Sequence, residues 1–114
     1  MRQVKRAVIK IGTSSLTYDN GRQNLRRMEQ IVRVVSDLKN AGMELVLVSS
    51  GAIGVGVSKL GLSERPKTIM GKQATAAVGQ CELMYLYDKL FSEYGHVVAQ
   101  VLLTKDIVLS LIHI

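Results

Sequence analysis

Near its middle the chain reads Leu45-Val46-Leu47-Val48-Ser49-Ser50-Gly51-Ala52-Ile53-Gly54-Val55-Gly56, an apolar run that changes abruptly into a run of small residues. The apolar residues 45–48 predict a strand that is buried on both faces. Ser49, Ser50 and Gly51 end this strand, and further glycines lead into a region that can be helical. The start of a helix presents unbonded N–H groups and the positive end of the helix dipole. Because glycine also lets a ligand approach the main chain closely, the segment predicts an anion-binding site.

Upstream of this segment we expect a strand, a loop and a helix. Residues 7–11 form a short apolar run that ends at Gly12, which predicts a strand. Residues 13–22 are polar and include Asp19-Asn20-Gly21, so they predict a mobile loop. Asn24 can cap a helix that Gly42 closes, since the apolar residues between them have helical spacing, at Leu25, Met28, Ile31, Val32, Val35 and Leu38.

Downstream, the alternation of helices and strands continues. Residues 52–60 predict a short helix and residues 61–66 a loop. Thr68 can cap a long helix that reaches about Tyr94 and ends at Gly95, and residues 97–103 predict a third strand. Strands that alternate with helices indicate an α/β fold, in which helices lie on the faces of a parallel sheet.

Composition limits the class of protein. The chain has 114 residues, enough for one domain at most, and a net charge of +6, which suits an anionic ligand or half of a domain whose acidic half is absent. The single Cys81 excludes an internal disulfide, and no signal peptide or membrane span is evident, so we expect a cytoplasmic protein. Basic residues cluster locally at Arg22, Arg26, Arg27 and Arg33, and on a helix residues 22, 26 and 33 would share roughly one face. No aromatic residues interleave them, which favours a solvated face over a nucleic-acid interface.

Lys10 is the most informative single residue, because it interrupts an apolar strand just before Gly12. It either reaches water at the strand end or binds an anion, since a lysine cannot stay charged in a core without a partner. Ligands of parallel α/β sheets bind beyond the carboxyl ends of strands. Lys10 with Gly12, and Ser50 with Gly51, both lie at such ends, and their convergence favours a functional site.

Several known site patterns are absent. Gly71-Lys72 lacks the spacing of a Walker A loop, and Gly51, Gly54 and Gly56 lack that of a dinucleotide-binding fingerprint. The two histidines and Cys81 form no metal-ligand pattern, and His96 is interpreted as a residue at a strand edge. Ser49 or Ser50 has no evident base that would make it a nucleophile.

Four segments together resemble the amino acid kinase family, and within it the enzymes that phosphorylate glutamate. They are residues 8–14, residues 48–53, Lys72-Gln73 with residues 77–80, and residues 102–105. The resemblance covers residues 4 to about 107. It implies a three-layer αβα sandwich with a mainly parallel sheet, of which residues 1–108 would be the N-terminal half, truncated after the third strand. Residues 109–114 depart from the family pattern, and we expect them to be a non-native or disordered tail.

The resemblance also implies an activity. ATP would phosphorylate the side-chain carboxylate of L-glutamate, the first step of proline biosynthesis, with Mg²⁺ as cofactor. Lys10 would be the catalytic residue and would contact the ATP phosphates together with Gly12, Thr13 and Ser14. Ser50, Gly51 and Ala52 would bind glutamate. The enzyme would be a cytoplasmic homo-oligomer that proline can inhibit.

The family domain is about twice as long as this chain, so we expect the 114 residues to be inactive alone. Further acidic residues, a second lysine and the adenine pocket would lie in the missing half. Three other interpretations stay open: a family member with another substrate, a phosphate- or nucleotide-binding module without catalysis and, least favoured, a nucleic-acid-binding domain.

Overall fold

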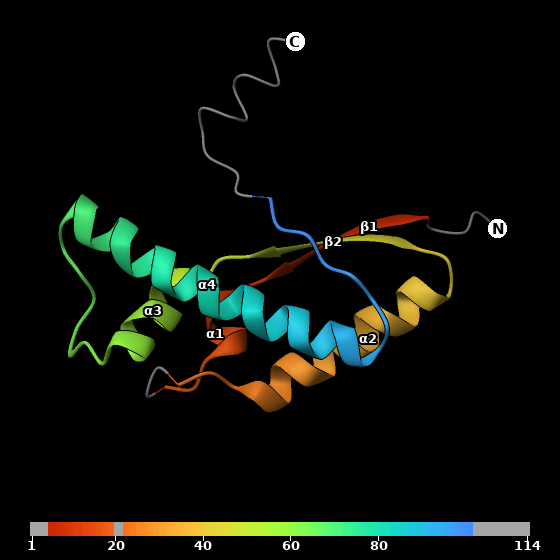
Figure 1. Cartoon of the computed structure of the whole chain (residues 1–114), viewed down its shortest axis with the longest axis horizontal. Helices are drawn as coiled ribbons and strands as arrows, with labels where there is room; N and C mark the ends of the chain where they lie inside the picture. The colour runs from red at the N-terminus through yellow and green to blue at the C-terminus, as the bar shows by residue number, and fades with distance from the viewer. Residues whose placement is uncertain (1–4, 20–21, 102–114) are drawn as a thin grey trace, which may run out of the picture.

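The computed structural model describes residues 5–19 and 22–101. In chain order the elements are β1 (Arg6–Ile11), α1 (Thr13–Leu16), α2 (Leu25–Asn40), β2 (Glu44–Ser49), α3 (Ala52–Leu60) and α4 (Ile69–Glu93) (Figure 1). The two strands pair in parallel with Ile11 opposite Ser49, so both end at the same edge of the sheet. The predicted α/β class and the parallel pairing of the first two strands are confirmed.

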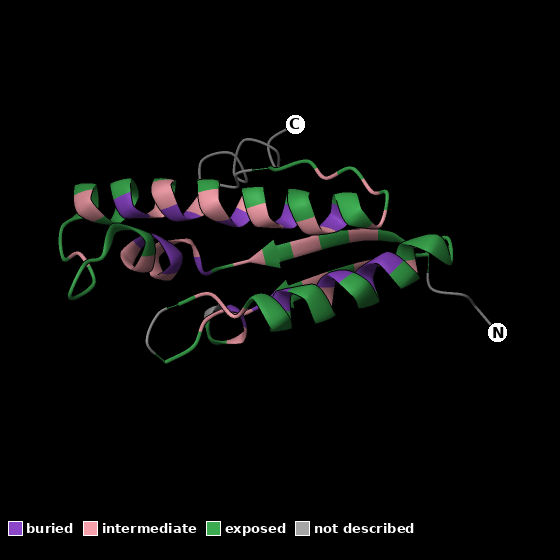
Figure 2. Ribbon diagram, turned by 60° about the horizontal axis from the view of Figure 1, so that its bottom comes forward, coloured by how far each residue is buried: buried purple, intermediate pink, exposed green. Residues whose placement is uncertain are grey.

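The two strands are covered on one face only. Exposed residues alternate with covered ones along both strands. Val8 and Val46, on the open face, are 71% and 58% exposed. The covered face packs with residues of both long helices in one apolar cluster, and Figure 2 shows the buried residues of α2 and α4 on the sides that face the strands. The prediction that residues 45–48 are buried on both faces is wrong, because the helices of the described ranges lie against one face. A second helical layer of the implied sandwich is not among these residues.

The helix α2 follows its sequence signals. Asn24 Oδ1 accepts a hydrogen bond from the backbone N–H of Arg27 at 3.1 Å, which caps the first turn. Gly42 has a φ of 98°, a conformation that glycine adopts without strain, and its N–H closes the last turn on Lys39 O at 3.0 Å. The apolar stripe of this helix supplies Met28, Val32 and Val35 to the core. The predicted start and stop of this helix are confirmed.

Residues 13–17, the first part of the predicted mobile loop, form regular structure. Thr13–Leu16 forms the single turn α1, and Thr17 makes an antiparallel bridge with Gln23. The prediction of a loop is wrong for this part, because Leu16 is 1% exposed and anchors the turn in the core. Burying one apolar side chain outweighs the polar character of its neighbours.

The helices α3 and α4 approach each other closely through two glycines. A Cβ on Gly79 would fall well inside van der Waals contact of Ala52 O and 2.7 Å from Gly56 N. A Cβ on Gly56 would similarly overlap the backbone carbonyl of Thr75. The predicted bounds of α3 are confirmed, and so is the cap of α4, where Thr68 Oγ1 accepts from Gly71 N at 2.9 Å.

The third predicted strand does not form over residues 97–101. These residues pair with neither β1 nor β2, and Val97 is 97% exposed. The reason is the end of α4, where Gly95 turns the chain and His96 N donates to Phe91 O at 3.0 Å. After this turn Val98 packs by its side chain against the apolar cluster, while the backbone of residues 97–101 lies next to no strand with which it could pair. His96 therefore closes a helix and is not at a strand edge. Residues 102–105, and the predicted tail at 109–114, lie outside the described ranges.

Candidate functional site

Two loops meet at the edge where both strands end. The backbone N–H of Ser50 donates to Ile11 O at 3.4 Å, which ties the start of one loop to the end of β1. Gly12 follows Ile11 and caps α1, while Gly51 follows Ser50 and caps α3. The structure therefore brings together the backbones of the two segments that the sequence analysis selected for phosphate and substrate.

The side chain of Lys10 projects from the open face of the sheet. It pairs in register with Val48 and is exposed, as is Val48 at 40%. Its ammonium group makes no hydrogen bond or ion pair with any residue that the structure describes. Lys10 therefore reaches water, which is one of the two possibilities that the sequence analysis gave for it. Its charge can still attract an anion.

The loop after β1 is open. Gly12 has a φ of −76°, which any residue can adopt, and a Cβ there would meet no atom within 4 Å. Ser15 N donates to Gly12 O at 3.1 Å, which sets the turn of α1, and Ser14 is exposed on it. Neither backbone conformation nor packing explains the glycine at position 12.

The loop after β2 is built differently. Ser50 is exposed, while Gly51 is buried and its carbonyl accepts from Val55 N at 3.0 Å to start α3. The first N–H groups of α3 have no acceptor within the helix, so they can donate to an anion. Behind them, Ala52 O rests on Gly79 of α4. The sequence analysis grouped Gly56 with this site, but the structure places it in the contact between the helices.

A buried pair of hydroxyls supports the end of β2, and the sequence analysis missed it. Ser49 Oγ and Tyr87 Oη are both buried, and neither forms a hydrogen bond of normal geometry within the described residues. Burial raises the pKa of Tyr87 above its ordinary value of 10.0, and the neighbouring Ser49 opposes part of this shift. The only sequence signal was a tyrosine on the apolar stripe of α4, which does not reveal its partner.

The arginine cluster is a solvated surface. Arg26, Arg27 and Arg33 are exposed on α2, and Arg33 pairs with Glu29 at 3.2 Å. Arg22 does not share their face, because α2 begins only at Leu25. The prediction of a common face is therefore wrong for Arg22.

The chemistry of the loop edge suits an anion. Its groups are backbone N–H donors, the hydroxyls of Ser14 and Ser50 and the ammonium of Lys10, all of which can bind phosphate or carboxylate oxygens. Over residues 5–19 and 22–101, His, Cys, Asp and Glu form no group of three or more that could hold a metal ion. In the same ranges, no helix is both long and apolar enough to cross a membrane.

Comparison with known proteins identifies the class. The profile of the amino acid kinase family matches residues 5–112, and the chain belongs to this family. It is 63% identical over 107 residues to a glutamate 5-kinase of Clostridium perfringens, covering 94% of this chain and 40% of that protein.

Glutamate 5-kinases of other bacteria show the same extent of similarity. A Listeria monocytogenes enzyme is 59% identical over 107 residues, covering 94% of this chain and 39% of that protein. An Enterococcus faecalis enzyme is 57% identical over 108 residues, covering 95% of this chain and 40% of that protein. The chain thus spans about two fifths of the length of these curated relatives.

Proposed function

We propose that the protein to which these residues belong is a glutamate 5-kinase. It transfers the γ-phosphoryl group of ATP to the side-chain carboxylate of L-glutamate and so forms L-glutamyl 5-phosphate, the first step of proline biosynthesis. The observation that carries the proposal is the hydrogen bond from Ser50 N to Ile11 O, because it joins the two loops that the chemistry requires side by side. The 63% identity to a glutamate 5-kinase supports the choice of substrate.

In this proposal the loop after β1 receives the phosphates. Lys10 contributes a cation at the carboxyl end of β1, and backbone N–H groups of Gly12, Thr13 and Ser14 donate to phosphate oxygens. Phosphoryl transfer depends mainly on positioning and on positive charge near the transferring group, so a lysine and a bare main chain are suitable catalysts. The open space beside Gly12 supports this assignment, because a ligand can reach the main chain there.

Ser50, Gly51 and Ala52 hold the acceptor. The hydroxyl of Ser50 and the N–H groups at the start of α3 bind glutamate, with its side-chain carboxylate directed toward the γ-phosphorus. A carboxylate oxygen forms the new bond to phosphorus as the bond between phosphorus and the bridging oxygen of ATP breaks. ADP leaves with the electron pair of that bond, and no proton has to move.

The donor set fits ATP phosphates better than it fits Mg²⁺. Mg²⁺ prefers carboxylate and water oxygens, whereas this edge offers N–H groups, hydroxyls and an ammonium. We therefore assign phosphate contacts to this chain and no Mg²⁺ ligand. A cytoplasmic location, a homo-oligomeric state and inhibition by proline are further parts of the proposal that come from the family resemblance.

A chimera tests the function directly. The aligned 107 residues of this chain replace their counterparts in the Clostridium perfringens glutamate 5-kinase, which is 63% identical over them. We expect the purified chimera to form glutamyl phosphate from ATP and glutamate, measured as the hydroxamate, and added proline to lower the rate. A folded chimera that phosphorylates aspartate or acetylglutamate but not glutamate would replace this proposal with another activity of the family.

The 114-residue chain provides the second arm of the experiment. We expect no hydroxamate from it, because the matched relatives are more than twice as long and carry residues that it does not include. Turnover by the 114 residues at the rate of the chimera would show that the chain needs no further residues for catalysis.

A further inference from the structure

A cavity lies beside α3, one helical turn beyond the proposed glutamate-binding residues. Its volume is about 280 Å³. The six residues that line it come from the segment before α2, from α3 and from α4, and are Arg22, Gln23, Val55, Ser58, Lys59 and Glu82. None of them has a role in the proposed function.

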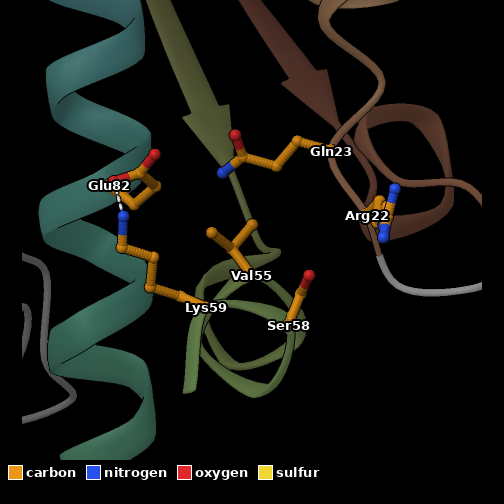
Figure 3. Close-up of a pocket in the computed structure, with 6 residues that line it drawn as sticks. All are labelled: Arg22, Gln23, Val55, Ser58, Lys59 and Glu82. Atoms are coloured by element: carbon orange, nitrogen blue, oxygen red, sulfur yellow. Dashed lines mark ion pairs between the residues drawn. The ribbon is translucent and has the colours of Figure 1, made fainter. Parts of the chain in front are cut away.

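The side chains around this cavity present donors toward its centre. Figure 3 shows Gln23 and Ser58 pointing from opposite sides toward the space above Val55. Gln23 Nε2 is buried and has no hydrogen-bond partner within the residues that the structure describes. A buried amide with unused N–H groups loses free energy unless an acceptor reaches it, so this group favours a ligand that carries an acceptor.

The charges of the lining favour an anion. Arg22 and Lys59 are cations, and Glu82 is the one carboxylate among the six residues. Lys59 Nζ lies 3.4 Å from Glu82 Oε2, and the lysine side chain is 57% exposed. Because water surrounds this ion pair, the lysine can exchange the carboxylate for another anion at little cost. The lining therefore has one positive charge more than negative charge.

The floor of the cavity is apolar. Val55 is 1% exposed in the protein and presents its methyl groups between the polar walls (Figure 3). Because Val55 itself is almost fully covered, the apolar surface that an organic acid can bury comes from the methylene groups of Gln23 and Lys59, and a bare inorganic anion gains nothing from it.

We propose that this cavity binds a small aliphatic carboxylate. The carboxylate accepts hydrogen bonds from Gln23 Nε2 and Ser58 Oγ, Arg22 and Lys59 supply the positive field, and the aliphatic part lies against the methylene groups of Gln23 and Lys59. The inference does not depend on the proposed function, because binding here requires no catalysis.

Isothermal titration of the 114-residue chain with sodium glutarate at constant ionic strength tests the proposal. Glutaramide, which has the same shape without the charges, and inorganic phosphate serve as comparison ligands. We expect glutarate to bind more tightly than either. Binding of glutaramide as tight as that of glutarate overturns the proposal. Glutarate binding that the variants of the cavity lining leave unchanged also overturns it, because such binding takes place at the loop edge instead.

Variants of the lining give effects of opposite sign. Gln23→Leu removes the buried donor and should weaken glutarate binding about tenfold, and Lys59→Met should weaken it several-fold. Glu82→Gln should strengthen it by about threefold, since it removes the negative charge and releases Lys59 for the ligand.

The matched control is Lys67→Gln, a charge change at an exposed lysine that pairs with Glu64 outside the cavity, and it should leave the affinity within about twofold. Circular dichroism verifies the fold of each variant. If Gln23→Leu does not fold, the two surface variants decide, because Lys59→Met and Glu82→Gln must still act in opposite directions. Equal effects of these two variants, or an effect of Lys67→Gln as large as theirs, overturn the proposal.

Discussion

The contact between α3 and α4 and the loop after β1 both contain glycines, but for different physical reasons. At Gly79 and Gly56 a side chain would overlap backbone atoms of the opposite helix, so only glycine permits the observed packing. At Gly12 the backbone is in an ordinary conformation and the surroundings are open. A glycine that packing requires belongs to the scaffold, whereas a glycine that nothing in the fold requires is a candidate for ligand contact. The following substitutions test this distinction.

The largest effect is expected for Gly79→Ala. The new methyl group meets Ala52 O and Gly56 N, which are backbone atoms and cannot move aside independently of α3. Overpacking of this kind costs about 3 kcal/mol or more, which corresponds to a fall in Tm of about 12 °C or more for a domain of this size. Thermal unfolding followed by circular dichroism measures it. A variant with the Tm of the parent chain would show that α3 and α4 can move apart without a loss of stability.

Lys10→Ala should have the largest effect on catalysis. In the chimera we expect kcat to fall by about 10²–10³, the loss typical of one preorganised charged donor, without a change in Tm. Lys5→Ala is the matched control, because Lys5 is an exposed lysine just before β1 and has no assigned role. Equal kcat values for the two variants would remove Lys10 from the mechanism.

Gly12→Ala separates ligand contact from packing. Since a Cβ at this position meets no atom within 4 Å, the free energy of unfolding should change by less than about 0.5 kcal/mol. In the chimera, KM for ATP should nevertheless rise about tenfold, because the methyl group occupies space that the phosphates need. A large loss of stability with an unchanged KM would assign Gly12 to the scaffold instead.

Tyr87 lies on α4, the helix of the glycine contact, and faces Ser49 at the end of β2. Burial raises the pKa of Tyr87, so the folded chain keeps this proton at a higher pH than the unfolded chain does. Its contribution to stability is complete below pH of about 10 and is lost as the pH rises toward the folded-state pKa.

The pH dependence is measured by urea unfolding between pH 8 and pH 11. Tyr87→Phe should remove part of the decline in stability above pH 10, because the phenol is absent. Tyr85→Phe should keep the decline, since Tyr85 is 59% exposed on the same helix. Identical slopes for both variants would exclude Tyr87 as the source.

The smallest effect is expected for Thr68→Ala. It removes the hydroxyl that accepts from Gly71 N at 2.9 Å and should cost about 1 kcal/mol through the first turn of α4. In the chimera, kcat should not change, because Thr68 is not among the residues assigned to phosphate or glutamate. Ser63→Ala, in the exposed loop before α4, should change neither quantity.

Sequence predicts the local parts of this structure well. The caps at Asn24 and Thr68 and the glycines that end helices depend on a few neighbouring residues, and the observed bounds agree with them. The parallel pairing of the first two strands follows from their alternation with helices. The candidate residues at the loop edge were found for the same reason, since a glycine directly after a strand is a local signal.

Features that depend on distant parts of the chain could not be predicted. Burial on both faces was expected for residues 45–48, but a run of apolar residues does not reveal which helices cover it. The turn at Leu16, the closeness of Gly79 to Ala52 and the position of Tyr87 next to Ser49 each depend on the tertiary arrangement. The carboxylate cavity joins residues from three separate segments, so no single stretch of sequence contains its signal.

Cys81 is the only cysteine of the chain, and it is exposed on α4 immediately before Glu82. A thiol-reactive fluorophore therefore attaches at one position without any prior mutagenesis. The dye would sit beside the cavity wall while the glycine-packed side of α4 stays undisturbed. A change in its fluorescence would then show in real time whether a ligand occupies the cavity, in a chain with no substitution.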